Sequence, residues 1–295
     1  MNSLSYRTQP LKLNGEFTSR AYTAEVMNYI EQDDKKSQSG VVIEFDLIYK
    51  GSDEKGLLIY IIEVKKRFLI NSKKSVVRKP DKSERLALKV ASINDFLELR
   101  VDKNYKLRRV INTEDIRLKW KELKDSLLDD YPDLIKMITD FDWQLEDENI
   151  QKIFIEDNFY QCFFANIYNQ EFEPQKGITQ PKTVMNGLGN INIPIVEHKK
   201  VSTQGRRRSP SLHITTSAKM DVEQEKFPLA KLNVFLGKLP TTSGAQHELD
   251  FDYKGIYTVK PDIGLLTKGH LAYSFEVKGL YKKTTTITFN IKNNE

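Results

Sequence analysis

The chain has 295 residues, of which 39% are hydrophobic and 29% charged, and its formal net charge is +5. These values are typical of a globular protein with enough core for one large domain or two smaller ones. No stretch approaches the ~18 consecutive apolar residues that cross a bilayer, and a single cysteine cannot form an intrachain disulfide. The first residues lack the charged and then apolar pattern of a signal peptide, so we expect a cytoplasmic protein with no membrane partner.

The charge is unevenly distributed along the chain. Residues 1–112 carry 22 Lys and Arg against 15 Asp and Glu, a net charge of +7. Residues 113–173 carry 6 against 16, which gives −10, and residues 174–295 carry 18 against 10, which gives +8. Two basic regions therefore flank an acidic one, a distribution that favours binding between oppositely charged surfaces.

The N-terminal region, 1–112, is predicted to be rich in β-strands. Residues 16–31 suit either a helix or a strand. Val41–Lys50 alternates apolar and polar residues, which predicts a strand with one wet face, and Leu57–Ile62 is apolar on both faces, which predicts a central strand. Phe96–Val101 and Lys106–Ile111 flank a turn and predict a hairpin. Leu86, Val90, Ile93 and Leu97 fall at helical spacing, but Leu86, Leu88 and Val90 also alternate as in a strand. We favour the strand and expect an antiparallel meander that continues to residue 111.

Helical spacing replaces strand spacing in the acidic segment, 113–172. Asn112 can cap a first helix, and Pro132 is suited to the first turn of a second. A third helix is predicted over Asp147–Tyr168, and its second half is apolar nearly all round. This third helix is expected to be the most buried of the three.

Prolines and glycines interrupt every long pattern in 173–210, which predicts an irregular basic arm. The C-terminal region, 211–295, alternates again over Ser211–Asp221, His247–Val259 and His270–Ile291, with a short strand expected at Leu232–Leu236. The overall prediction is an α+β fold in which two antiparallel β-rich regions flank an acidic helical segment.

Three residues of the N-terminal region form a motif with chemical meaning. Asp46 lies on the first predicted strand, and Glu63-Val64-Lys65 lies on the next. This pattern resembles the metal site of the PD-(D/E)xK nucleases. The resemblance implies that Asp46 and Glu63, with Glu16 or Glu25 as a further carboxylate, would hold Mg²⁺ while Lys65 positions the attacking water.

A second copy of the motif argues against this nuclease interpretation. Pro261-Asp262 is followed by Glu276-Val277-Lys278, but the chain then continues as a strand where the family places a helix. Ordinary alternation accounts for Glu276 and Lys278 as a solvated pair on one face. The preferred interpretation therefore assigns no catalytic residue, metal or cofactor, and the Mg²⁺-dependent nuclease is kept as the alternative.

The remaining reactive residue types indicate no catalytic site. Cys162 lies among aromatic residues, which is typical of a core position and not of a reactive thiol. The four histidines have no ligand spacing, so we expect no zinc.

The basic arm supplies the candidate partner-binding residues, Lys199, Lys200, Arg206, Arg207 and Arg208. Such clusters neutralise phosphates of nucleic acid or bind acidic protein surfaces. The acidic helical segment offers such a surface, within the chain or in a second copy. The sequence therefore predicts a non-enzymatic binding or assembly subunit that recognises a macromolecular partner through sheet edges and charged surfaces.

Overall fold

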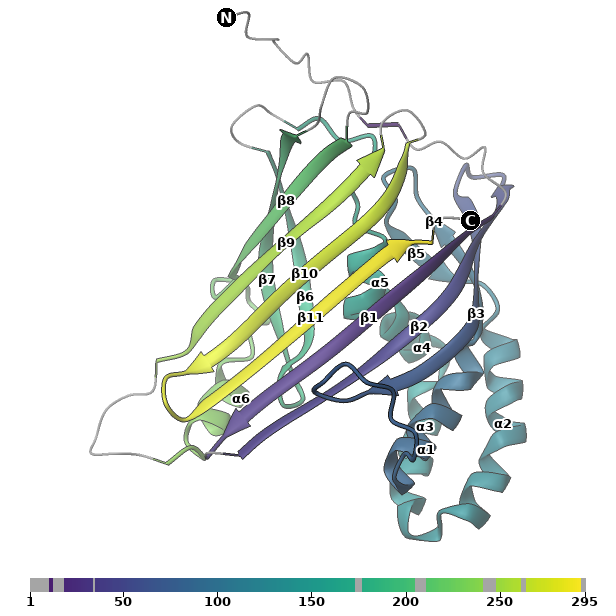
Figure 1. The fold of residues 1–295 in the computed structure, drawn as a ribbon, viewed down its shortest axis with the longest axis vertical. Coiled ribbons are helices and arrows are strands. Elements are labelled where there is room, and N and C mark those ends of the chain that lie inside the picture. Colours follow the sequence, from purple (N-terminus) through teal and green to yellow (C-terminus); the bar gives the residue numbers. More distant parts are fainter. Residues whose placement is uncertain are drawn as a thin grey trace, which may run out of the picture. The chain divides into compact units, whose positions relative to one another are not determined.

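The computed structural model describes residues 11–12, 19–33, 35–172, 177–204, 211–240, 248–260 and 264–292. Within these residues eleven strands form one antiparallel sheet in the order β5-β4-β3-β2-β1-β11-β10-β9-β8-β7-β6 (Figure 1). The strands are β1 Ser19–Gln32, β2 Lys35–Ser52, β3 Leu58–Ile70, β4 Phe96–Val101, β5 Leu107–Val110, β6 Ile178–Leu188, β7 Ile191–Gln204, β8 Ser211–Met220, β9 Asp250–Lys260, β10 Leu265–Val277 and β11 Tyr281–Ile291. The α-helices are α1 Lys82–Ala91, α2 Thr113–Asp130, α3 Ile135–Gln144, α4 Asp147–Glu156, α5 Asn158–Phe163 and α6 Leu229–Leu236.

The predicted α+β fold with two separate β-rich regions is wrong. Strand β1 lies between β2 and β11 in the sheet order, so the first and last strands of the described chain are neighbours. The strands before and after the helical segment therefore belong to the same sheet. The pairing joins residues about 260 positions apart, and alternation along a single strand carries no information about so distant a partner.

The chain divides into two compact units. The N-terminal unit is formed mainly by Ser39–Ala165, and the C-terminal unit is formed mainly by Asn166–Asn290 together with Val26–Gln38. Strands β1 and β2 therefore contribute residues to both units. No helix among the described residues is both long enough and apolar enough to cross a membrane.

Aromatic side chains fill the core of the N-terminal unit. The Phe45 ring of β2 stacks on Tyr22 at 5.6 Å between centroids, and the Phe163 ring of α5 meets both rings edge-on. The inward face of β2 is the one predicted from its alternation, with Phe45 and Leu47 buried. The hairpin of β4 and β5 is confirmed by antiparallel pairing, including Arg100 opposite Arg109.

Helix α1 replaces the strand that we expected before this hairpin. Its start has a capping box, because the Asp81 side chain accepts from the Glu84 backbone N–H and the Glu84 carboxylate accepts from the Asp81 N–H, both at 2.8 Å. This signal satisfies the first helical N–H groups and decides between the two competing periodicities. The long third helix expected over 147–168 is also divided, because Asp157 ends α4 and caps α5.

Two strands occupy the segment predicted to be an irregular arm. Pro194 lies in β7, but pairing with β8 begins only at Ile195 opposite Met220, so the missing N–H removes no ladder bond on that side. The Pro194 carbonyl instead accepts from the Asp221 N–H at 2.9 Å. Pro181 lies in β6, the last strand of the sheet, where proline is tolerated. The predicted strand at 232–236 is also wrong, since these residues lie in α6.

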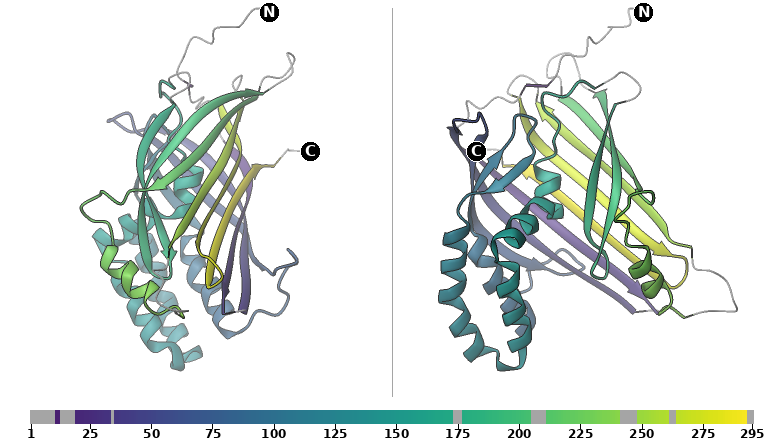
Figure 2. Two further views of the ribbon diagram at one scale, coloured as in Figure 1. Left: turned by 90° about the vertical axis from the view of Figure 1, so that its left-hand side faces the viewer. Right: turned by 180° about the vertical axis from the view of Figure 1, so that it is seen from behind.

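The alternation predicted over His270–Ile291 is confirmed, but the run is not continuous, because a turn at 278–280 divides it into β10 and β11. Leu271, Tyr273, Phe275 and Val277 of β10 are buried, and the residues between them are partly exposed. Within the C-terminal unit β6 curves over this face (Figure 2). The contact is close, because a Cβ atom at Gly187 would lie only 2.8 Å from the Phe275 ring.

Candidate functional site

A groove of about 530 Å³ lies between α6 and the turn that joins β6 to β7. Its lining comes from both elements and consists of Leu188, Gly189, Asn190, Ile191, Ala230, Lys231, Val234, Phe235 and Lys238. The turn is short, because Leu188 pairs with Ile191 and leaves only Gly189 and Asn190 between the strands. Gly189 has φ of +54°, a backbone conformation typical of such two-residue turns. The groove could not be predicted from the sequence pattern, because an irregular arm was expected in place of β6 and β7 and a strand in place of α6.

Helix α6 presents one face to the groove and another to the core. The groove residues 230, 231, 234, 235 and 238 share one side of the helix, whereas Leu232 is buried. The Phe235 ring rests edge-on against Tyr281 of β11 at 5.1 Å. Val234 is 60% exposed and Leu229 is 59% exposed. The eight-residue α6 therefore leaves two branched apolar side chains, Val234 and Leu229, exposed to water.

Two ammonium groups accompany this apolar surface, from Lys231 and Lys238, which are exposed. Helix α6 contains no Asp or Glu. The groove therefore combines apolar contact with positive charge. This combination suits a ligand that has an apolar body and one or more anionic groups, because both interactions are made at once.

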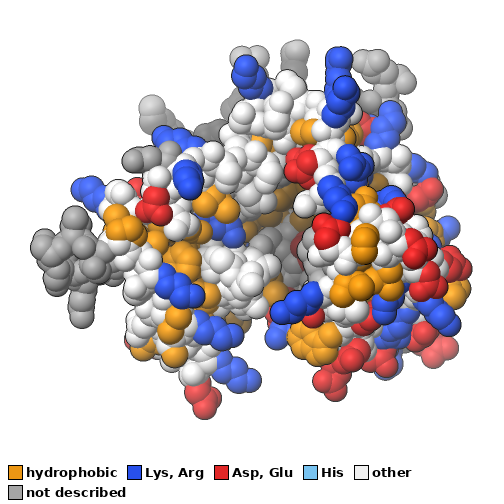
Figure 3. All heavy atoms as spheres, turned by 90° about the horizontal axis from the view of Figure 1, so that it is seen from below, with side chains coloured by type: hydrophobic (Ala, Val, Ile, Leu, Met, Phe, Trp, Pro, Cys, Tyr) orange, Lys and Arg blue, Asp and Glu red, His pale blue; other side chains and the backbone are white. Residues whose placement is uncertain are grey.

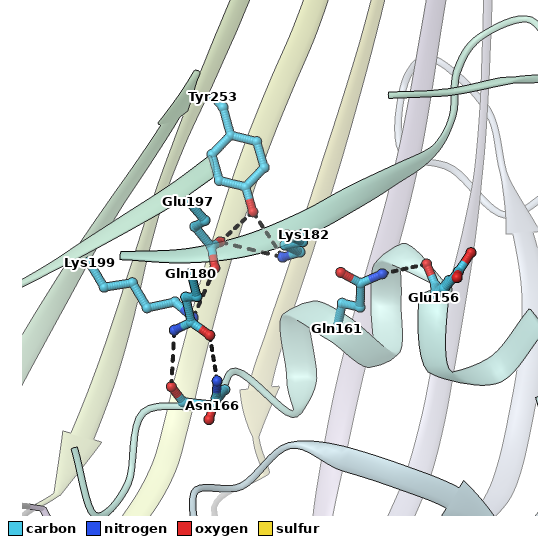
Figure 4. Close-up of polar contacts among 8 residues, drawn as sticks. All are labelled: Glu156, Gln161, Asn166, Gln180, Lys182, Glu197, Lys199 and Tyr253. Carbon is cyan, nitrogen blue, oxygen red and sulfur yellow. Dashed lines mark hydrogen bonds and ion pairs between the residues drawn. The ribbon is translucent and has the colours of Figure 1, made fainter. Parts of the chain in front are cut away.

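A second polar constellation lies inside the C-terminal unit (Figure 4). The Glu197 carboxylate of β7 accepts from the Tyr253 hydroxyl at 2.5 Å and lies 2.9 Å from the Lys199 ammonium. Lys182 of β6 lies 3.4 Å from the same carboxylate, and its ammonium donates to the Tyr253 hydroxyl at 2.9 Å. The Glu197 and Lys199 residues are each only 2% exposed. We call these four residues the buried ion cluster.

The electrostatics of the buried ion cluster favour an ionised carboxylate. Burial by itself raises the pKa of Glu197, but the ammonium groups of Lys182 and Lys199 and the Tyr253 hydroxyl outweigh burial and lower the pKa to about 2. Glu197 is therefore charged at neutral pH. It ties β6 and β7 to β9, although β8 separates β7 from β9 in the sheet.

A pair of amides extends the polar contacts at the same end of β6. Gln180 is the partner of Glu197 in the β6–β7 ladder. The Asn166 side chain donates to the Gln180 side chain, and the Gln180 amide donates to the Asn166 carbonyl at 3.3 Å. These hydrogen bonds therefore tie β6 to the loop that precedes it.

The structure brings Asp46, Glu63 and Lys65 together. Asp46 and Glu63 are cross-strand partners on β2 and β3, and a register shift between Glu44 and Phe45 leaves Lys65 as the extra residue of a bulge. The Lys65 ammonium lies 2.6 Å from Glu63 and 3.6 Å from Asp46. The pKa of Lys65 is raised, chiefly by the hydrogen bond to Glu63.

The other residues of the nuclease motif lie apart from this trio or outside the described residues. Glu25 pairs with Lys74 at 2.7 Å. Glu16 and Pro261-Asp262 lie outside the described residues. In the second motif Glu276 pairs with Lys282 at 2.7 Å, its cross-strand partner on β11. Glu276 therefore does have a lysine on its face, but that lysine is Lys282 and not Lys278.

The predicted partner-binding tract is divided by the structure. Lys199 lies in β7 and belongs to the buried ion cluster, so its ammonium faces the core, whereas Lys200 is exposed. Arg206, Arg207 and Arg208 lie outside the described residues. A sequence signal for the burial of Lys199 exists, because it continues the alternation of Ile191, Ile193 and Ile195, all buried. The charge of Lys199 concealed this signal.

The cysteine and two of the histidines lie among the described residues in the following surroundings. Cys162 is buried, as a core residue would be. His198 contacts Thr179, and His213 contacts Thr258 and Ser211. Among the described residues no three His, Cys, Asp or Glu side chains are grouped so that they could hold a metal ion.

Comparison with known proteins gave structural similarity to solved structures but no family. No family model matches the chain, and no curated protein matches its sequence. Its fold is similar to part of a solved structure of lipovitellin, which was described for lipid–protein interactions, with a TM-score of 0.42 and 6% sequence identity. The similarity covers 97% of this chain and 26% of the lipovitellin chain, so this chain spans about a quarter of that protein's length.

Proposed function

We propose that the protein is a non-enzymatic binding subunit that holds an apolar, negatively charged segment of a macromolecular partner. The groove between α6 and the β6–β7 turn is the binding site, and the exposure of Val234 beside Lys231 and Lys238 is the observation that supports it. Exposed apolar side chains grouped with charges of one sign are typical of interaction sites. The net charge of +8 over 174–295 adds long-range attraction for such a partner.

A groove on a helix is favoured over the sheet edge at β5. The Gln151 side chain of α4 accepts from the Val110 N–H at 2.9 Å and donates to the Val110 carbonyl at 2.8 Å. Gln151 thus makes the two hydrogen bonds that an added strand would make at this residue. Strand addition at β5 would first have to displace α4, whereas the groove needs no such rearrangement.

Two fluorescent probes test this proposal. We expect 8-anilinonaphthalene-1-sulfonate, an apolar anion, to bind the folded protein saturably, and the uncharged N-phenyl-1-naphthylamine to bind more weakly. Val234→Glu should abolish binding of both probes, because it places a carboxylate in the groove. Lys231→Gln with Lys238→Gln should weaken only the anionic probe.

Val222→Glu is the matched control for Val234→Glu. Val222 is 61% exposed but does not line the groove, so its substitution should leave probe binding unchanged. If Val234→Glu binds both probes as the unmodified protein does, the groove is not the binding site and the proposal is wrong.

A Mg²⁺-dependent nuclease is the second candidate, supported by the convergence of Asp46 and Glu63 on neighbouring strands with Lys65 in a bulge. For metal to bind, the Lys65 ammonium must first leave the carboxylates, because it now neutralises one of their two charges. Incubation of plasmid DNA with the protein and Mg²⁺ tests this candidate. Cleavage that is lost in Glu63→Ala would establish it, and cleavage that persists in Glu63→Ala, or no cleavage at all, would exclude this site.

A further inference from the structure

Helix α3 presents a second exposed apolar surface, in the acidic N-terminal unit. Ile135 and Trp143 are 52% and 63% exposed, and the exposed residues Thr139 and Asp140 lie between them. Ile135, Thr139 and Trp143 follow the four-residue spacing of one helix face, and Asp140 is three positions before Trp143, next to that face. Ile138 is buried, and the Phe141 ring packs on Trp120 of α2 at 4.8 Å between centroids, so the other side of the helix faces its own unit. We call the exposed face of Ile135, Thr139, Asp140 and Trp143 the α3 face.

Acidic side chains surround the α3 face. Asp140, Glu146 and Glu148 are exposed, against one exposed lysine of α3, Lys136, and the whole segment 113–173 has a net charge of −10. Figure 3 shows acidic, basic and apolar side chains intermixed at the lower right of the view. The α3 face is therefore an apolar surface with negative charge around it.

The α3 face and the α6 groove match in length as well as in charge. Ile135 and Trp143 are eight positions apart, or about 12 Å along a helix axis, and the eight-residue α6 has about the same length. Each surface pairs branched or aromatic side chains with charge, negative on α3 and positive on α6. A groove of about 530 Å³ has room for an aromatic side chain and its neighbours.

We infer that the α6 groove of one copy of this chain binds the α3 face of a second copy. This inference rests on the proposed function and names the partner. Trp143 is the anchor, because exposed tryptophans that become buried in a pocket contribute strongly to binding. Lys231 and Lys238 face the carboxylates around α3, which sets the orientation and speeds association.

The contact joins two different surfaces, so it is heterologous. Each copy has one groove and one α3 face, and association therefore continues beyond a dimer unless a ring closes. The expected behaviour of the full-length protein is a molar mass that rises with concentration. High salt should weaken the association, because it screens the exposed charges.

Two variants with opposite defects test the inference by light scattering and sedimentation equilibrium. Trp143→Glu keeps the groove but loses the α3 anchor, and Val234→Glu with Lys231→Glu keeps the α3 face but loses the groove. Each should be monomeric alone, with a dissociation constant raised at least about thirty-fold. Their mixture should form a 1:1 dimer and nothing larger, because it contains a single competent pair of surfaces.

Leu118→Glu is the matched control, since Leu118 of α2 is 58% exposed and lies outside the α3 face. It should associate as the unmodified chain does. A monomeric unmodified chain at every concentration, unchanged association of Trp143→Glu, or a mixture that stays monomeric would each overturn the inference. Saturable probe binding that is lost in Val234→Glu would still support the proposed function in those cases, so the two failures are distinguishable.

Discussion

The Tyr253 hydroxyl donates a 2.5 Å hydrogen bond to the Glu197 carboxylate across strand β8, which lies between the strands of these two residues. Tyr253 and Glu197 are both buried, so the bond forms in a region of low dielectric constant, and two lysines lie beside the carboxylate. Networks of this kind are strong only while every member has a partner. The buried ion cluster is therefore expected to be sensitive to the loss of a single charge.

Glu197→Gln should destabilise the fold by about 3–5 kcal/mol, because it leaves two lysine ammonium groups in the core without the carboxylate that pairs them. Urea unfolding measures the change. Glu276→Gln is the control, since it removes a carboxylate from the partly exposed pair with Lys282 and should cost at most about 1 kcal/mol. An equal loss of unfolding free energy in the two variants would show that the buried ion cluster contributes no more to stability than a surface pair.

The stabilisation from Glu197 should be lost in acid. Burial raises the pKa of this group, but the neighbouring lysines and Tyr253 lower it to about 2 in the folded state, against 4.5 as the ordinary value. The contribution is therefore complete above about pH 4.5 and falls as the pH drops toward 2. Thermal unfolding of the native chain and Glu197→Gln between pH 2 and pH 7 should give melting temperatures that converge at the acidic end. Parallel curves over this range would contradict the assignment.

Strands that depend on local signals could be predicted from the sequence. The alternation in Val41–Lys50 and the turn between Phe96–Val101 and Lys106–Ile111 each act over a few residues, and the structure has strands there. The single sheet could not be predicted, because pairing of β1 with β11 depends on residues at opposite ends of the chain. The strand at Pro194 could not be predicted either, because a strand tolerates proline only where no ladder bond needs its N–H, and this depends on where the ladder with β8 begins.

The candidate sites were harder to predict from the sequence than these strands. Asp46 and Glu63 do meet, because a hairpin fixes their register locally. Glu197 and Lys199 were not recognised as core residues, because charge is normally a sign of exposure. Helix α6 was mistaken for a strand, since an apolar run of this length suits either element. The groove beside it therefore could not be foreseen.

Asp157→Asn should stabilise the protein at alkaline pH. Burial raises the pKa of Asp157 to about 6, although the carboxylate accepts hydrogen bonds from the backbone N–H groups of Tyr160 and Phe159. Ionisation above pH 6 therefore costs up to about 3 kcal/mol of folding free energy. Asparagine keeps the capping oxygen for α5 without the charge.

Urea unfolding at pH 4 and pH 8 measures the effect of Asp157→Asn. The gain should be largest at pH 8 and should vanish as the pH falls below 3.8, where aspartic acid is neutral in both states. Asp81→Asn, at the exposed cap of α1, controls for the change of capping residue itself. A gain that is the same at both pH values would show that the charge of Asp157 is not its cause.

Gln151→Leu should expose the edge of the sheet at β5. The Val110 backbone is buried, and without Gln151 its N–H and carbonyl lose both partners. The expected cost is about 2–4 kcal/mol in urea unfolding, because unpaired buried backbone groups cost about 1–3 kcal/mol each.

Lys152→Leu places the same side chain at the adjacent exposed position of α4, so it measures what a surface leucine does by itself. An opened edge should also recruit other strands, so Gln151→Leu should aggregate on heating at a lower temperature than Lys152→Leu. Trp143→Glu should not reduce this aggregation, because strand pairing at Val110 does not involve α3. The aggregation can therefore be told apart from association through the α3 face. If Gln151→Leu and Lys152→Leu unfold and aggregate alike, Gln151 does not protect the edge.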